Sequence, residues 1–121
     1  MKTYGVLINK CYGGYGFSEE FEEKLIELTG TEFPVYHVNR HDERLIALYN
    51  AFIQFNANPH GWAAHLEVVN VPVGLNYEID EYDGSESLST FLYVTVDELT
   101  KGLSQEKLQL LSHTKNIKLL G

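Results

Sequence analysis

The chain has 121 residues, of which 44% are hydrophobic, and this size suits one folded domain spanning residues 1–121. Its single cysteine, Cys11, excludes an internal disulfide, so a reducing compartment is expected. The formal net charge of −8 would be repelled by phosphate backbones, so we expect no direct binding to nucleic acid.

No apolar segment approaches the roughly 20 residues that cross a bilayer. The first residues, Met1–Val6, lack the apolar segment and cleavage site of a signal peptide. We therefore expect a soluble cytoplasmic protein with no membrane partner, located in the cytoplasm of the host cell if the chain is viral.

The first predicted elements are a strand and a helix. Thr3–Asn9 is apolar on both faces, which is typical of an inner strand. Ser18 is a good N-cap for a helix over Glu19–Leu28, and Gly30 can close that helix.

A second strand and a second helix follow. Phe33–Val38 is predicted to be a strand, and Pro34 favours a place at the sheet edge. Asn39 or Asp42 then caps a helix that runs to about Phe55.

The rest of the chain is richer in strands. Asp83-Gly84 is a turn signal, and Ser104 can cap a short last helix. In chain order, the predicted elements are strands over Leu66–Val71, Leu75–Tyr82 and Phe91–Val96, a helix over Gln105–Leu111, and a tail or edge strand over Asn116–Leu120.

The element order β-α-β-α-β-β-β-α predicts an α/β (α+β) fold, with a mixed sheet of about five strands and two main helices on one face. The other face of the sheet then needs a cover. Aromatic residues alternate along the predicted strands at Tyr77, Tyr82, Phe91 and Tyr93, so we expect a homo-oligomer that buries part of this face. The alternative is a cover made by the C-terminal segment.

A loop rich in glycine and aromatic residues, Lys10–Phe17, precedes the first helix. Glycines at such a place let backbone N–H groups approach a ligand, and a helix N-terminus favours a phosphate or carboxylate. Aromatic rings can stack on a base or sugar, although the glycine spacing fits neither a Walker loop nor the dinucleotide fingerprint. The alternative is a tight connection whose rings cap the core. The candidate ligand-binding residues of the loop are Tyr12, Gly13, Gly14, Tyr15, Gly16 and Phe17.

The segment Tyr77–Glu86 holds five carboxylates within nine residues. On a strand Asp80 and Tyr82 share one face, and both are further ligand-binding candidates. A calcium loop is excluded because Tyr82 stands where an oxygen ligand is needed. A hard-metal site from Asp80, Asp83 and Glu86 stays open beside the more usual outcome, a solvated strand end and turn.

Arg40 and Arg44 are the only arginines of this acidic chain. Arginine is well suited to phosphate and carboxylate recognition, so both are ligand-binding candidates, and ion pairs with acidic residues such as Glu43 are the alternative. His37 and His41 straddle a strand end and a helix start without a second pair of ligands, so no metal site is predicted there.

A catalytic role for Cys11 would need a base nearby, and no histidine can be placed beside it from the sequence. Trp62, the only tryptophan, lies in a loop and either closes the core edge or anchors an interface. We predict no catalytic residue, no cofactor and no metal, and therefore a binding protein rather than an enzyme.

The run Ile8–Ser18, Ile-Asn-Lys-Cys-Tyr-Gly-Gly-Tyr-Gly-Phe-Ser, together with Asn39–Asp42 and Tyr77–Glu86, resembles a family of short proteins. These proteins are carried widely by bacteriophages and some large viruses, mostly without an assigned function. The resemblance covers about residues 3–88. Family members end soon after the acidic motif with a His-Arg-aromatic tail, whereas this chain departs from the pattern beyond residue 90.

A weaker resemblance is to the viral sponge proteins that disarm Thoeris immunity. It implies an oligomer that binds cyclic ADP-ribose isomers without cleaving them, with the glycine-rich loop on the nucleotide and Tyr82 stacked on the base. We therefore expect a non-enzymatic viral protein that sequesters a small nucleotide-like signal and blocks host immune signalling. The alternative is an acidic protein-binding inhibitor of a host defence protein or nuclease.

Overall fold

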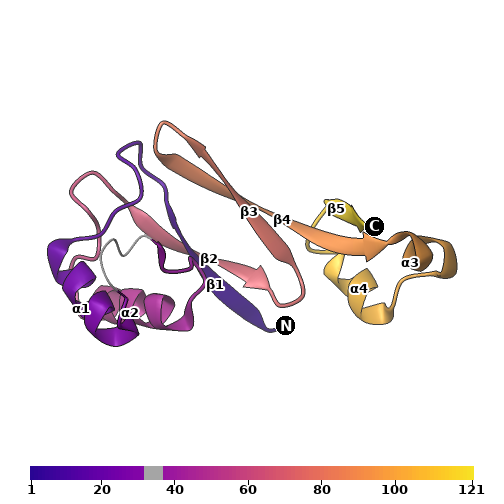
Figure 1. The fold of residues 1–121 in the computed structure, drawn as a ribbon, viewed down its shortest axis with the longest axis horizontal. Coiled ribbons are helices and arrows are strands. Elements are labelled where there is room, and N and C mark those ends of the chain that lie inside the picture. Colours follow the sequence, from indigo (N-terminus) through magenta and orange to yellow (C-terminus); the bar gives the residue numbers. More distant parts are fainter. Residues whose placement is uncertain (32–36) are drawn as a thin grey trace.

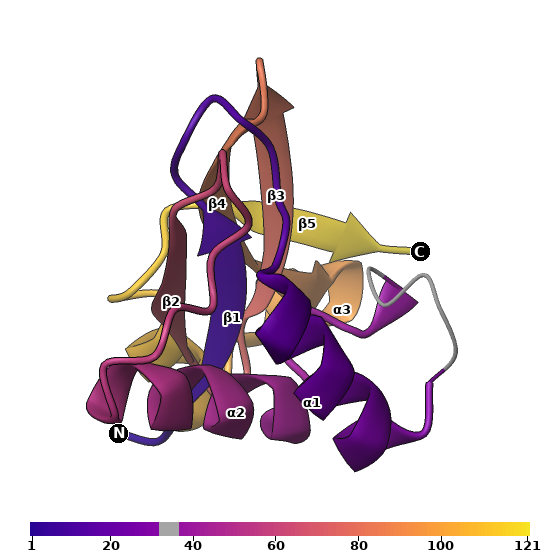
Figure 2. The same ribbon diagram turned by 90° about the vertical axis from the view of Figure 1, so that its left-hand side faces the viewer.

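The computed structural model describes residues 1–31 and 37–121 as an elongated molecule with helices at both ends and strands between them (Figure 1). Figure 2 looks along the long axis, with α1 and α2 in front of the strands. In chain order the elements are β1 (Thr3–Asn9), α1 (Glu19–Thr29), α2 (Glu43–Gln54), β2 (Leu66–Pro72), β3 (Asn76–Tyr82), β4 (Ser85–Thr95), α3 (Val96–Lys101), α4 (Gln105–Leu110) and β5 (Ile117–Leu120).

The mixed α+β fold with five strands is confirmed, but the strands form two sheets instead of one. β1 and β2 pair antiparallel, with Thr3 opposite Pro72 and Asn9 opposite Leu66. β3 and β4 form an antiparallel hairpin, and β5 adds to β4 in parallel. At the second edge of β1, the Leu7 amide donates to the Arg40 carbonyl at 2.9 Å and the Asn9 backbone amide donates to the Glu86 side chain at 2.8 Å, so these two amides do not pair with another strand.

β1 lies between two hydrophobic cores, which explains why both its faces are apolar. Leu7 points into the first core, between the β1–β2 ladder and the two main helices. Val6 and Ile8 point into the second core, between this ladder and the β3–β4 hairpin. The first core contains Leu7, Phe17, Phe21, Leu25, Val38, Leu45, Phe52 and Leu66, and the second contains Val6, Ile8, Val71, Leu75, Leu92, Val94 and Leu110.

The two main helices begin and end where their capping residues predict. The Ser18 hydroxyl accepts from the Phe21 amide, and α1 ends at Gly30. Asp42 caps α2 by accepting from the Arg44 amide at 2.8 Å, and the side-chain hydrogen bond from Arg44 lowers the pKa of Asp42 to about 2. Of the two proposed caps for α2, Asp42 is therefore the one used.

The predicted turn at Asp83-Gly84 is the tip of the β3–β4 hairpin. Both residues have positive φ angles, 50° and 88°, which matches the two-residue turn that favours an Asp-Gly pair. Alternate side chains of β3 point to opposite faces: Tyr77 and Ile79 are half-buried, whereas Asp80 is exposed. The outward face of the hairpin is mostly polar, but it also carries Phe91, which lies opposite Asn76 and is only 6% exposed, with the Lys118 ammonium 4.1 Å from its ring centroid.

Several boundaries differ from the predictions. β4 begins at Ser85 rather than Phe91, because its serine-rich outward face hid the alternation that marks a strand. Helix α3, which Thr95 caps in a capping box with Glu98, was not predicted. The predicted strand over Phe33–Val38 lies mostly outside the described residues. None of the helices in residues 1–31 and 37–121 has the length and apolar composition to cross a bilayer.

Candidate functional site

Asn9, the last residue of β1, anchors the glycine-rich loop from within the protein. Its side-chain amide donates to the carbonyls of Cys11 at 2.7 Å and Gly84 at 2.8 Å. Its side-chain oxygen accepts from the amides of Cys11 at 3.2 Å and His65 at 2.8 Å. One buried carboxamide thus connects the loop, the hairpin tip and the start of β2.

A buried ion pair supports the same region. Arg40 donates to both carboxylate oxygens of Glu86, each at 2.8 Å, and also to the Leu7 carbonyl at 3.1 Å. The Glu86 carboxylate also accepts from the backbone amide of Asn9 at 2.8 Å. Burial is the largest single influence on Arg40 and opposes its charged form, but the hydrogen bond to Glu86 and the electrostatic interactions with Tyr15, Glu86 and Tyr77 together outweigh it and raise the pKa of the guanidinium. Such bidentate pairs are strong and directional.

Two aromatic residues of the loop turn toward this interior. The guanidinium carbon of Arg40 lies 3.4 Å from the ring centroid of Tyr15, a cation–π contact. The ring of Tyr15 meets that of Phe17 edge to face at 5.0 Å, and Phe17 is buried in the first core against Phe21. These rings therefore contribute to packing, while Tyr12 is exposed.

The backbone of the loop forms one wall of a small open recess with a volume of about 220 Å³. The opposite wall is the segment 61–64, which is fixed to the loop by the Gly61 amide, a donor to the Gly16 carbonyl at 2.9 Å. Gly13 packs closely against Ala63, since an added Cβ would lie 1.7 Å from the Ala63 carbonyl oxygen. The lining residues are Gly13, Gly14, Tyr15, Gly16, Phe17, Gly61, Trp62, Ala63 and Ala64.

Trp62 stands at this recess with a relative exposure of 101%, so its side chain is not part of the core. Within the described residues, the backbone hydrogen bonds use neither the Gly13 amide nor the Gly16 amide. The recess thus combines a flat, exposed indole ring with a wall of glycine backbone.

The other candidate residues lie outside this recess. The guanidinium of Arg44 donates to both carboxylate oxygens of Asp42, at 2.9 and 3.1 Å, and that of Arg40 donates to Glu86. Asp80 and Tyr82 are exposed on the outward face of β3. The structure therefore brings Gly13–Phe17 together but gives both arginines partners within the protein.

The hard-metal hypothesis fails on the register of the hairpin. Asp80 lies opposite Ser87, and Glu81 lies opposite Glu86, so Asp80 and Glu86 point to opposite faces. Among residues 1–31 and 37–121, no group of three or more metal-ligating side chains could hold an ion. The Cys11 thiol is half-buried, and no hydrogen bond joins it to a histidine in the described part of the chain.

A second polar cluster, which was not predicted, lies at the start of α2. His41 Nδ1 lies 2.5 Å from the Tyr77 hydroxyl, and both rings pack against Tyr4. Burial raises the pKa of Tyr77 despite the nearby charge of Arg40. The alternation of β3 correctly separates Tyr77 from Asp80, but no sequence signal relates it to a histidine 36 residues earlier.

The chain matches no known protein-family model, and no curated protein and no solved structure is significantly similar to it.

His60 precedes the 61–64 wall and makes a hydrogen bond that depends on its protonation state. Its Nδ1 accepts from the Leu66 amide at 2.9 Å, which requires the neutral ring at that nitrogen. Burial, and then the charge of the stacked His65, lowers the pKa of His60. Because the folded-state pKa is below the unfolded value of about 6.5, this stabilisation is complete above pH 6.5 and is lost as the pH falls through the folded pKa.

We expect the His60→Gln variant to lose less stability than the wild type on acidification below pH 6.5. The expected difference is about 0.5–1 kcal/mol, the contribution of one ordinary hydrogen bond. Urea unfolding at pH 7.5 and pH 5 measures it. The exposed His113 provides the control, because His113→Gln should keep the wild-type pH dependence. Equal pH dependence in wild type and His60→Gln would contradict the assignment.

Proposed function

We propose that this chain is a non-enzymatic binding protein for a nucleotide-like small molecule, one planar ring of which occupies the recess beside Trp62. The observation that carries the proposal is the fully exposed indole at a recess whose opposite wall is glycine backbone. A flat ring can stack on the indole, and its acceptor atoms can receive the amides of Gly13 and Gly16.

The size of the recess argues for a ring and against a whole dinucleotide. Pockets that enclose drug-sized ligands measure about 300–1,000 Å³, and this recess holds about 220 Å³. A nucleobase or a ring of similar size is therefore the enclosed part. The sugar and any phosphate would extend into solvent.

The charges around the recess weaken recognition of a phosphate. Arg40 and Arg44 are engaged with Glu86 and Asp42. The first turn of α1 carries three glutamates, which offset the positive end of its helix dipole. Binding by ring stacking and neutral hydrogen bonds fits this environment better than binding by charge. A chain that held a cyclic ADP-ribose isomer in this way would remove the signal from solution without cleaving it.

Ligand binding is tested with a panel of nucleosides, cyclic nucleotides and ADP-ribose isomers. The only tryptophan provides the readout, because a ring stacked on Trp62 should quench its fluorescence, and calorimetry gives the affinity. We expect at least one compound to bind and Trp62→Ala to weaken binding at least tenfold, about 1.4 kcal/mol. The matched control is Phe55→Ala, another exposed aromatic residue that does not line the recess.

The proposal fails if the folded protein binds no member of the panel, or if both alanine variants lose affinity equally.

A second candidate function is inhibition of a basic protein partner. Exposed carboxylates on α1 and on the outward face of the hairpin favour it, as does the net charge of −8. Capture from host lysate that weakens steeply with salt, without any response to the panel, would favour this second candidate.

A further inference from the structure

The short strand β5 breaks the pattern of burial seen on β4. In the parallel register, Leu92 lies beside Ile117 and Val94 beside Leu119, so these four side chains share one face of the sheet. Leu92 and Val94 are buried, whereas Ile117 is 44% exposed and Leu119 is 60% exposed. The inner face of the sheet therefore remains apolar at β5, but its side chains there are exposed to solvent.

β5 also presents an open strand edge. The Leu92 amide donates to the Asn116 carbonyl at 3.0 Å, which places the backbone groups of alternate residues, 116, 118 and 120, toward β4. The N–H and C=O groups of Ile117 and Leu119 then face away from the sheet. In the part of the chain that the structure describes, β4 is the only strand paired with β5. Such an edge is a template for another strand.

The charge of this end of the molecule differs from that of the rest. Residues 92–121 contain four lysines and three carboxylates, whereas residues 1–91 contain five basic residues and fourteen carboxylates. Two copies would repel each other through most of their surfaces but not through this end. Lys118 of β5 is neutralised within its own chain by an ion pair with Glu78 and lies 4.1 Å from the centroid of the Phe91 ring.

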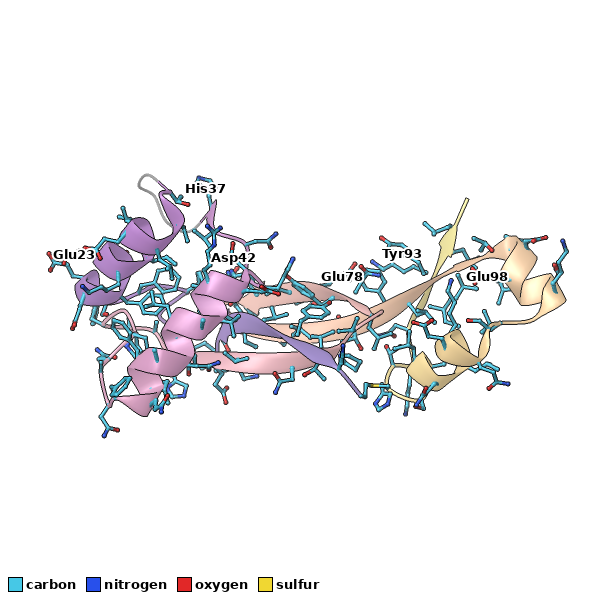
Figure 3. The ribbon with its side chains drawn as sticks, turned by 90° about the horizontal axis from the view of Figure 1, so that it is seen from below. Glu23, His37, Asp42, Glu78, Tyr93 and Glu98 are labelled. Carbon is cyan, nitrogen blue, oxygen red and sulfur yellow. The ribbon has the colours of Figure 1, made fainter. Side chains whose placement is uncertain are left out.

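We propose that β5 pairs antiparallel with β5 of a second copy of this chain, across a two-fold axis through Lys118. Ile117 of each copy then exchanges backbone hydrogen bonds with Leu119 of the other, and the two sheets become continuous. The exposed aliphatic side chains of both strands meet on the inner face and cover one another. Figure 3 shows that this end, marked by Tyr93 and Glu98, projects away from α1 and α2, so a second copy can approach it.

The expected dimer is weak and reversible. A contact between two four-residue strands is smaller than the roughly 800 Å² per partner of a standard interface. A dissociation constant of about 1–100 μM is therefore expected. Because the contact is apolar and carries little charge, added salt should not weaken it.

Sedimentation velocity of the full chain from about 1 to 500 μM tests the dimer. The wild type should shift from monomer to dimer with concentration, and Leu119→Glu should stay monomeric at the highest concentration, a loss of at least tenfold in affinity. Leu119→Pro should act in the same way, since proline removes an amide that faces the open edge and leaves the pairing with β4 intact. The matched control, Leu28→Glu, changes an exposed leucine on α1 and should dimerise like the wild type.

Circular dichroism and melting temperature establish that each variant is folded, as the exposure of Leu119 leads us to expect. A wild type that stays monomeric at 500 μM would overturn the proposal. So would a dimer that persists in the folded Leu119→Glu and Leu119→Pro variants, or one that Leu28→Glu disrupts. None of these outcomes depends on the recess, so ligand binding and dimer formation are judged separately.

Discussion

Glu86→Ala is expected to lower the free energy of unfolding by about 3 kcal/mol, the largest effect of any single substitution considered for this chain. The side chain of Glu86 is only 7% exposed, and that of Arg40 is 23% exposed. Removing the carboxylate leaves the mostly buried guanidinium of Arg40 without its counter-charge. It also leaves the backbone amide of Asn9 without its acceptor. Chemical denaturation measures the loss, which corresponds to a melting temperature lowered by roughly 10 °C or more.

A double-mutant cycle separates the ion pair from simple loss of packing. Arg40→Met and Glu86→Leu should each be strongly destabilising, whereas the double variant should lose clearly less than the sum, because it leaves no unpaired charge. Additive losses would contradict the assigned role of the pair. Asp42→Ala with Arg44→Ala serves as the comparison, since that ion pair is exposed on its arginine side and should show a coupling below about 1 kcal/mol.

Gly13→Ala is expected to distort the recess and lower the free energy of unfolding by about 1–3 kcal/mol. The added Cβ would lie 1.7 Å from the Ala63 carbonyl oxygen and 2.3 Å from the Ala63 Cβ, so one wall must move. Because Ala63 belongs to the wall opposite the loop, the shift changes the shape of the recess and should abolish ring binding. Denaturation and the fluorescence titration report the two effects separately.

Gly16→Ala is the matched control for this substitution. Gly16 lies in the same loop and lines the same recess, but a Cβ added there meets no atom within 4 Å. We expect its stability to stay within about 0.5 kcal/mol of the wild type. If Gly13→Ala proves as mild as Gly16→Ala, the close approach of the two walls is not what shapes the recess.

Local signals predicted the local structure well. Ser18, Gly30 and Ser104 mark helix ends because each acts through hydrogen bonds to residues within a few positions along the chain. The Asp83-Gly84 turn was predictable for the same reason, since its positive φ angles follow from the two residues themselves. The alternation along β3 also separated the side chains of its two faces, although it did not indicate which face is inward.

The pairing of residues far apart along the chain could not be predicted from such local signals. The division into two sheets depends on β1 pairing with β2 across more than fifty residues. The bond between Arg40 and Glu86 spans 46 residues, so both appeared available for a ligand or a metal when considered separately. Asn9, which bonds to His65 and Gly84, gave no signal at all, because a buried carboxamide at a strand end looks like any polar loop residue.

The glycine-rich loop was located correctly, yet its parts have different roles. Phe17 packs in the core and Tyr15 lies beneath Arg40, while the glycine backbone and Trp62 border the recess. No local signal links Trp62 to the loop, because 45 residues or more separate them along the chain. The bridge between Phe17 and His60 and the hydrogen bond from the Gly61 amide to the Gly16 carbonyl bring the two segments together in the folded chain.

The position of β1 between the two cores has a consequence for how the molecule comes apart. Val6 and Ile8 serve one core and Leu7 serves the other, so detaching this strand exposes both at once. An elongated protein with separate cores would otherwise melt in stages. Here the shared strand couples the stability of the two cores. Heat or denaturant should therefore unfold the protein in a single cooperative transition.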